Sequence, residues 1–465
     1  MNHLKVKHGT LRINQITLTC LLALSVLTVI GSLPAGAQSP LTINDLFVQL
    51  GETVQGFGGM YVDPANDTLY IWIVPGPQPA SAQIKQAVSG VFGSDAPPET
   101  NLVVLDAQYS YRQLLSWQDF SESEIFSIPD VVSMGIHHKT NRLEIGVLND
   151  AARQAVEAKL ADLGIPLHAV EIAHEDPRPP AHKNPPPPAE DEKCTSLQSK
   201  CRPVVAGLQI QHKGGNCSLG FSATGMGDDK KEYPGFVTAG HCANQEFRNT
   251  GTLYYQNAVA GGKKIGKEAK NPPLVEGPWE YNERNKCFKG EKCRLSDSLF
   301  AKYEGDLDFG KDVKVGFIAR PKLGETDWNG TDYFRIMGSG RSVEGENIAK
   351  VGRSTGWTEG TVVRVCVTAR FFQQRQAFLC QNRTDFSGEA GDSGGPVFRC
   401  RDPKDKKCSD AVKAGNFDVL LLGIFANGNS SNRYYSDFML IQNDKTELGK
   451  LTKFCAPAGQ DPSCT

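Results

Sequence analysis

The first half of the chain, residues 38–175, alternates hydrophobic runs typical of strands with runs that have helical spacing. The predicted elements are strands at TLYIWIV (68–74), NLVVLDAQ (101–108) and HAVEIAH (168–174), helices at 81–92 and 150–164, and a hairpin over 131–147 that turns at 139–141. Gly164 is placed to end the second helix, because Pro166 follows it. This mixture predicts a small α/β (or α+β) domain.

From Cys194 onward the pattern changes to short apolar runs that are separated by turns. Runs such as VVAGLQIQ, GFVTAG, KVGFIAR, GTVVRVCVTA and VLLLGIFA are split by segments rich in Gly, Asn and Asp, and helical periodicity is scarce. Many short strands between turn signals predict an all-β sandwich or barrel. The chain therefore predicts a second, all-β domain over 194–465.

A proline-rich segment, residues 176–193, separates the two predicted domains. Seven of the twelve residues from Pro177 to Pro188 are proline. Such a composition favours an extended polyproline conformation and acts as a semi-rigid spacer that proteases can reach. We therefore expect a linker at 176–193.

The N-terminus has the three-part pattern of a secretory signal peptide. Basic residues precede the apolar run Ile16–Ile30, and the small-residue sequence LPAGA ends at Ala37. The run is shorter than the roughly 20 residues that span a bilayer. We expect cleavage after Ala37, with residues 1–37 removed, a secreted (extracellular or periplasmic) protein, and no membrane attachment afterwards.

The cysteines support an oxidising destination. Of 13 cysteines, Cys20 lies in the predicted signal peptide, and the other 12 lie between Cys194 and Cys464. An even number of cysteines in an exported chain predicts disulfides. Pairing of sequence neighbours suggests Cys194–Cys201, Cys217–Cys242, Cys287–Cys293, Cys366–Cys380, Cys400–Cys408 and Cys455–Cys464, although other connectivities stay open.

Charge and spacing argue against several classes of partner. The net charge of −2 gives no overall field that would attract nucleic acid, so none is expected as a partner. There is no C-x-x-C motif and no histidine pair at ligand spacing, which disfavours a zinc site. We expect no metal and no cofactor.

Two short motifs suggest nucleophilic chemistry. Ser393 lies in GDSGGP, and His241 lies in TAGHC at the end of an apolar strand. A serine hydroxyl needs a base that takes its proton, and the base needs a carboxylate that orients it. His212 is the other histidine after Cys194, and we expect it at the surface.

The motifs TAGHC and GDSGGP resemble the histidine and serine boxes of chymotrypsin-like (trypsin-fold) serine proteases. The order of His241 before Ser393 fits that clan, and FVTAGHC, KVGRSTGWTEGTV and GDSGGPVF resemble secreted bacterial members of the streptogrisin and α-lytic protease type. The resemblance covers roughly Arg202 to Gly449. It implies a two-barrel protease domain, a protein or peptide substrate, and synthesis as a zymogen.

The third member of the implied triad must be chosen among several aspartates. Asp297 precedes an apolar run, as the family pattern requires, whereas Asp306 and Asp308 lie in a glycine-flanked segment and remain competitors. The resemblance assigns His241 as base, Ser393 as nucleophile and an aspartate, best Asp297, as orienting group. It also implies an oxyanion hole formed by the N–H groups of Gly391 and Ser393.

The resemblance also gives expectations for the surroundings of the site. Asp392 is expected to form a buried ion pair, with Arg353 or Lys350 as its partner. Residues 38–175 would form a pro-domain that acts as intramolecular chaperone or inhibitor. The alternative is a retained accessory domain, and its histidines His137 and His138 are expected to be solvated in a hairpin turn.

The leading hypothesis is therefore a secreted serine endopeptidase. The first alternative is a protease-fold binding protein that has lost activity, although an intact Ser393, His241 and a plausible aspartate argue against it. The second is an esterase of the α/β-hydrolase type, which the chain order of His241 before Ser393 disfavours.

Overall fold

The computed structural model describes residues 41–465, except 67, 77–78, 98–100, 178–193, 257–261, 281–284, 306, 372–374, 403–406, 429–431, 458, 460–463 and 465. The predicted signal peptide and most of the predicted linker lie outside these residues. Residues Ser39–Thr465 belong to one compact unit. Among the described residues, no helix is both long and apolar enough to cross a membrane.

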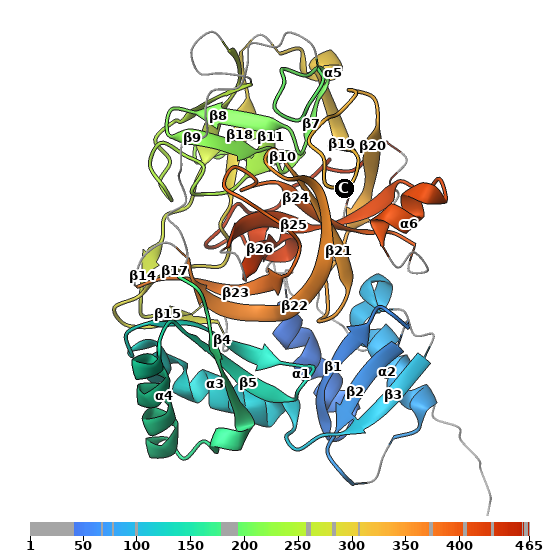
Figure 1. The fold of residues 1–465 in the computed structure, drawn as a ribbon. Coiled ribbons are helices and arrows are strands. Elements are labelled where there is room, and N and C mark those ends of the chain that lie inside the picture. Colours follow the sequence, from blue (N-terminus) through green and yellow to red (C-terminus); the bar gives the residue numbers. More distant parts are fainter. Residues whose placement is uncertain are drawn as a thin grey trace, which may run out of the picture. The chain divides into compact units, whose positions relative to one another are not determined.

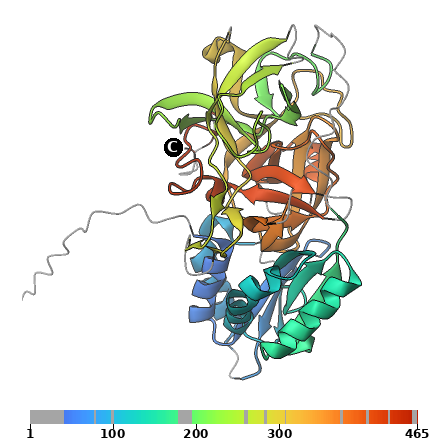
Figure 2. The same ribbon diagram turned by 90° about the vertical axis from the view of Figure 1, so that its left-hand side faces the viewer.

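The N-terminal region (residues 43–174) contains the same arrangement twice (Figure 1). Each copy has a helix, an antiparallel hairpin, a second helix and a last strand that pairs in parallel with the second strand of the hairpin. The first copy contains α1 (Ile43–Thr53), β1 (Phe57–Asp63), β2 (Thr68–Ile73), α2 (Ser81–Phe92) and β3 (Asn101–Asp106). The second contains α3 (Tyr111–Phe126), β4 (Val131–His137), β5 (Arg142–Val147), α4 (Asp150–Asp162) and β6 (Val170–His174). Figures 1 and 2 show α3 and α4 against the strands β4 and β5.

Local signals explain most of these elements. Thr42 caps α1 through a capping box with Asp45, and Asn149 accepts a 2.9 Å hydrogen bond from the N–H of Ala152 at the start of α4. Gly164 has a φ of +70° just after α4, which is the left-handed conformation that ends many helices. All the strands and helices predicted for this region are present, and the sequence interpretation missed α1, β1 and α3.

The cysteine-rich region (residues 194–465) is built from strands, as the pattern of short apolar runs predicts. Its first barrel is a seven-stranded sheet. In spatial order the strands are β10 (Phe221–Met226), β11 (Glu232–Thr238), β18 (Leu299–Tyr303), β13 (Lys263–Lys270), β12 (Leu253–Gln256), β8 (Gln209–His212) and β9 (Gly215–Ser218). Phe221, Phe236, Tyr254 and Phe300 are fully buried inside it.

The second barrel belongs to a larger, mainly antiparallel sheet. Its main strands are β7 (Val204–Ala206), β19 (Val313–Ala319), β20 (Tyr333–Ser339), β21 (Asn347–Gly352), β22 (Gly356–Arg370), β23 (Gln376–Thr384), β24 (Pro396–Cys400), β25 (Asp418–Gly428) and β26 (Arg433–Asp437). Smaller elements are β14 (Val275–Glu276), β15 (Trp279–Glu280), β16 (Lys286–Cys287), β17 (Lys292–Arg294), α5 (Phe309–Asp312), α6 (Cys408–Lys413) and α7 (Phe438–Ile441). The predicted architecture, an all-β two-barrel region after a small α/β region, is confirmed.

Strand β22 joins the two regions, because it pairs with β23 and also, antiparallel, with β4 (Figure 1). Charged side chains surround this pairing. Arg383 contacts Glu144 at 2.6 Å, Arg364 is bonded to the same carboxylate, and Arg370 donates to the carbonyl oxygens of Val131 (2.8 Å) and Phe126 (2.6 Å). The contact therefore combines backbone pairing with buried ionic bonds.

The expectation that His137 and His138 are solvated is wrong. His138 is fully buried, its ring lies 4.7 Å from that of Phe47 between ring centroids, and burial lowers its pKa to about 3. His137 lies between Glu171, at 2.6 Å from its Nδ1, and Glu344, at 3.4 Å from its Nε2. The two imidazoles are shielded because Phe47 of α1 and Glu344 of the cysteine-rich region pack against them, although Lys139 of the turn is exposed, and a local pattern does not reveal such packing.

One buried acid at this contact makes stability depend on pH. Glu122 of α3 lies beside Thr368 of β22, and burial raises its pKa from 4.5 to about 8. The folded chain holds this proton at neutral pH, so stability falls as pH rises from about 4.5 through 8. We expect Glu122→Gln to stabilise the full chain by roughly 2–4 kcal/mol at pH 9 and by little at pH 5.

Thermal unfolding of wild type and Glu122→Gln at both pH values checks this expectation. Glu124→Gln is the control, because this exposed acid on the same helix forms only a surface ion pair with Lys159, and its replacement should change stability little at either pH. A Glu122→Gln effect that is equal at pH 5 and pH 9 would contradict it.

Candidate active site

His241 lies in a loop that directly follows strand β11. The disulfide Cys217–Cys242 ties this loop to β9, and the hydroxyl of Tyr254 donates a 2.8 Å hydrogen bond to the carbonyl oxygen of Cys242. The imidazole is 1% exposed. A covalent bond and a buried hydrogen bond therefore hold the histidine on a rigid part of the first barrel.

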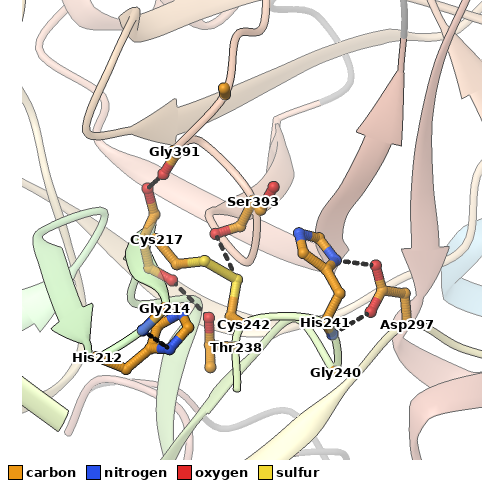
Figure 3. The surroundings of a disulfide bond; sticks show 12 residues. His212, Gly214, Cys217, Thr238, Gly240, His241, Cys242, Asp297, Gly391 and Ser393 are labelled. Atoms are coloured by element: carbon orange, nitrogen blue, oxygen red, sulfur yellow. Dashed lines mark hydrogen bonds and ion pairs between the residues drawn. A yellow bond between two sulfur atoms is a disulfide. The ribbon is translucent and has the colours of Figure 1, made fainter. Parts of the chain in front are cut away.

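Asp297 lies next to this histidine, in the loop between β17 and β18. Its carboxylate accepts two hydrogen bonds from His241, one from the backbone N–H at 3.0 Å and one from Nδ1 at 2.6 Å. Figure 3 shows the imidazole between Asp297 and Ser393. Since Nδ1 contacts the carboxylate, Nε2 is the nitrogen that remains to accept a proton.

The second barrel also supports Asp297, through residues that sequence reasoning missed. The backbone N–H of Asp297 donates to Oγ of Ser436 at 2.8 Å, and Ser436 in turn donates to the side-chain oxygen of Gln381 at 2.8 Å. The amide nitrogen of Gln381 donates to the carbonyl oxygen of Leu295 at 2.7 Å. These residues lie 84 to 139 positions further along the chain, so no local motif connects them.

Ser393 lies in a tight loop before β24. Gly391 has a φ of +97°, and a Cβ atom there would lie 2.7 Å from the side chains of Arg353 and Ser354. Gly394 has a φ of +82°, and its Cβ would lie 2.1 Å from the hydroxyl of Thr238. Glycine is therefore required on both sides of the serine, by backbone conformation and by space.

Two N–H groups of this loop form no hydrogen bond within the described part of the chain. The carbonyl oxygen of Ser393 accepts from the N–H of Ser218 at 2.8 Å, and the N–H of Asp392 donates to Glu389 at 3.0 Å. Within the described part of the chain, no hydrogen bond uses the N–H of Gly391 or of Ser393. These are the two donors that the resemblance assigns to an oxyanion hole.

Asp392 anchors the loop through a buried ion pair with Lys350, at 3.1 Å, in which both side chains are fully buried. Its carboxylate also accepts from the N–H of Ser354 (2.8 Å) and the hydroxyl of Thr355 (2.7 Å). Burial raises the pKa of Asp392, but Lys350 and these hydrogen bonds lower it by more, so it stays below 3.8. Of the two partners expected for Asp392, the structure has Lys350, whereas Arg353 donates to Gln209 at 2.5 Å.

The remaining predicted residues are placed as follows. Asp308 lies away from the histidine, at the start of α5, where it accepts from the N–H of Gly310, and Asp306 lies outside the described residues. The expectation that His212 is at the surface is wrong, since it is 1% exposed and its ring packs against Tyr254. It ends strand β8, in which Gln209 and Ile210 are also buried.

Six disulfides are present, and they join the same cysteines as the neighbour pairing. They are Cys194–Cys201, Cys217–Cys242, Cys287–Cys293, Cys366–Cys380, Cys400–Cys408 and Cys455–Cys464. Cys217–Cys242 braces the histidine loop, and Cys366–Cys380 joins β22 to β23.

The described part of the chain holds two clusters of side chains that could bind a metal ion, and in each of them protein groups already bond to some of the ligand atoms. Cys217 and Cys242 lie close to His241, but their sulfur atoms are bonded to each other. His137, Glu144 and Glu171 also converge, but the guanidinium of Arg364 already binds both His137 and Glu144. A cation there would have to displace an arginine.

The charge of Asp297 controls the basicity of the histidine. Burial lowers the pKa of His241, but the charge of Asp297 and its hydrogen bond raise it, so the net shift is upward from 6.5. Glu246 adds to the upward shift. An imidazole of raised pKa takes up a proton more readily, which is what a general base next to a hydroxyl requires.

No protein-family model matches the sequence, and no curated protein matches it. The chain is similar to solved structures of bacterial chymotrypsin-like serine proteases. Nocardiopsis protease is 22% identical with a TM-score of 0.32, and the match covers 50% of this chain and 92% of that chain. Thermobifida fusca protease A (18%, TM-score 0.32) and Cellulomonas bogoriensis chymotrypsin (18%, TM-score 0.31) each match 50% of this chain and 91% of their own.

The ion pair under the serine loop gives a stability prediction. Lys350→Met leaves the carboxylate of Asp392 buried without a cation, so we expect it to destabilise the protein by about 3–5 kcal/mol. Arg335→Met removes a partly exposed ion pair with Asp418 and should cost at most about 1 kcal/mol. Denaturant unfolding with intact disulfides measures both variants, and equal losses would contradict the prediction.

Proposed function

We propose that the protein is a secreted serine endopeptidase that hydrolyses peptide bonds through an acyl-enzyme. One observation carries this proposal, namely the two hydrogen bonds between His241 and Asp297 in a buried setting next to Ser393. The loop around Ser393 adds two N–H donors without partners in the described chain. The six disulfides and the predicted signal peptide fit an exported protein.

Each group has a definite role in the proposed reaction. Nε2 of His241 takes the proton from the hydroxyl of Ser393, whose oxygen attacks the substrate carbonyl carbon. Asp297 holds the tautomer that carries its proton on Nδ1 and stabilises the imidazolium that forms. His241 then gives the proton to the leaving amine, and water hydrolyses the acyl-enzyme by the same groups.

The loop geometry serves the charge that develops on the substrate. As the carbonyl becomes tetrahedral, its oxygen gains negative charge, and the N–H groups of Gly391 and Ser393 are the donors for it. Removing one such donor typically costs 10²–10³ in kcat. Asp392 and Lys350 hold the loop in the conformation that presents these donors.

We further propose that the N-terminal region is a pro-domain that assists folding and restrains the protease until cleavage. Strand β4 pairs with β22, and Glu344 of the cysteine-rich region accepts from the N–H groups of His138 and Lys139, each at 3.0 Å. The region therefore bonds to a long strand of the second barrel. A barrel with many long-range strand pairings folds slowly, so a template at this strand would speed its assembly.

The triad proposal predicts a specific pH profile. The acid limb of kcat/KM should have a midpoint above 6.5, because the neutral imidazole is the active form and the pKa of His241 is raised. Asp297→Asn should lower kcat by about 10⁴ and move the midpoint down, since the charge that raises the pKa is lost.

Peptide hydrolysis between pH 4 and 9, with a fluorophosphonate label on Ser393, tests the triad. Ser393→Ala should lose both the label and the hydrolysis. Absence of a label on the wild type would sink the proposal and favour an inactive binding protein, and label without peptide cleavage would favour an esterase.

The pro-domain proposal predicts self-processing. Wild type secreted from a disulfide-permissive host should be trimmed to a species that begins near Cys194, whereas Ser393→Ala should remain a precursor that begins near Gln38. Intact mass and N-terminal sequencing distinguish the two species. Identical products from both proteins would show that self-processing does not occur and would favour a retained accessory domain.

A further inference from the structure

A buried ion pair outside the proposed triad lies against the loop that carries Asp297. Arg294 ends strand β17, and Glu447 comes from the C-terminal segment after α7, but Nη2 of the arginine lies 2.7 Å from Oε2 of the glutamate. Both side chains are fully buried. We propose that Arg294 and Glu447 are positioning residues that hold Asp297 in line with His241, an inference that rests on the proposed protease function.

Glu447 binds the chain just before Asp297. Its Oε1 accepts from the backbone N–H of Leu295 at 2.8 Å, and its Oε2 accepts from the hydroxyl of Ser296 at 2.6 Å. Together with the bond from Arg294, one carboxylate holds three successive residues. The two positions that precede the aspartate therefore cannot shift without breaking a buried hydrogen bond.

Arg294 binds the chain just after Asp297 and also reaches the histidine loop. Nη2 donates to the carbonyl oxygen of Ser298 at 2.8 Å, and Nη1 donates to the side-chain oxygen of Asn271 at 3.4 Å. Asn271 in turn donates to the carbonyl oxygen of Gly240 at 3.0 Å. The guanidinium thus links the residue after Asp297 with the residue before His241.

The packing at Gly240 shows how close the guanidinium comes to the proposed triad. A Cβ atom on Gly240 would lie 2.9 Å from Nη1 of Arg294 and 3.2 Å from Oδ1 of Asp297. A cation at this place would compete with His241 for the charge of Asp297. Glu447 neutralises that cation, so the pair holds the loop without weakening the bond between Asp297 and the imidazole.

The chemistry of the pair favours positioning over simple stabilisation. The attraction between two buried charges often fails to exceed the free-energy cost of removing both from water, and apolar residues of similar volume often stabilise a core at least as well. Apolar residues could not, however, bond to the backbone of Leu295 and Ser298. Because a catalytic group misplaced by about 1 Å can cost 10²-fold in rate, such directional bonds have a clear use here.

The main test replaces the pair by apolar residues in the secreted enzyme, as Arg294→Met/Glu447→Leu. We expect a folded protein with six disulfides whose kcat is about 10–100-fold lower, with KM changed less than about threefold. The matched control is Arg335→Met/Asp418→Leu, which removes an ion pair of the same 2.7 Å length on the second barrel and should leave kcat unchanged.

Two gentler variants keep the proposal falsifiable if the double variant does not fold. Ser296→Ala removes one donor to Glu447, and Arg294→Lys keeps the charge but loses the forked geometry, so each should lower kcat about 2–10-fold. Unchanged kcat per fluorophosphonate-labelled site in these variants, or in a folded double variant, would overturn the proposal.

A pH profile separates positioning from a general structural effect. Asp297 and Glu246 raise the pKa of His241, and the guanidinium of Arg294 lies against Gly240, the residue before this histidine. Glu447→Gln leaves Arg294 uncompensated, so the acid limb of kcat/KM should move to lower pH. A limb that does not move would overturn this role of Glu447, whereas a wild type without label or hydrolysis would instead overturn the proposed function.

Discussion

The cysteine-rich region is organised around one buried hydrogen bond, between the imidazole of His241 and the carboxylate of Asp297. A carboxylate without solvent is costly unless hydrogen bonds and a positive partner compensate it. Asp297 receives both bonds from His241, and its backbone is held by Ser436 of the second barrel. Because the two residues come from different loops, the strands on either side must be placed to fit them.

This constraint explains why the surroundings of the site are so polar for a protein interior. Ser436, Gln381, Glu447, Arg294 and Asn271 are all buried, and each bonds to the backbone of the aspartate or histidine loop or to another member of the group. Hydrogen bonds of this kind favour one arrangement of the side chains, and of the five residues only Arg294 has a buried polar atom, Nε, without a partner. The first barrel supplies the histidine, the connection between the barrels supplies the aspartate, and the second barrel fixes their distance.

The sequence predicted the parts of this site that follow local rules. TAGHC and GDSGGP are each a continuous segment of sequence. Cys242 is next to His241 in the first motif, and glycines flank Ser393 in the second, so both patterns can be recognised without knowledge of the fold. Asp297 could be favoured over Asp308 because an apolar strand follows it. Glu447, Gln381 and Ser436 could not be found, because only the folded sheet brings them within bonding distance of residues more than 80 positions away.

The same limit explains the errors on histidines. His137, His138 and His212 lie beside turns with exposed lysines, where local composition indicates solvent, but elements distant in sequence pack against each imidazole. His138 is covered by α1, and its buried ring is kept neutral by the lack of water. Burial of a turn residue is a tertiary property, and periodicity does not report it.

The disulfides and the N-terminal region constrain the chain over different lengths. The six disulfides join cysteines separated by only 6 to 25 residues, so each one restrains a local loop, by about 3 kcal/mol for a loop of some 15 residues. None of them connects the two barrels. Residues that are far apart in sequence are instead connected by strand pairing and by buried ion pairs. Strand β22 takes part in both, because it pairs with β4 and carries Arg364, which bonds to Glu144. A region that pairs with β22 during folding would therefore assist the formation of long-range strand pairs, which the short disulfide loops do not promote.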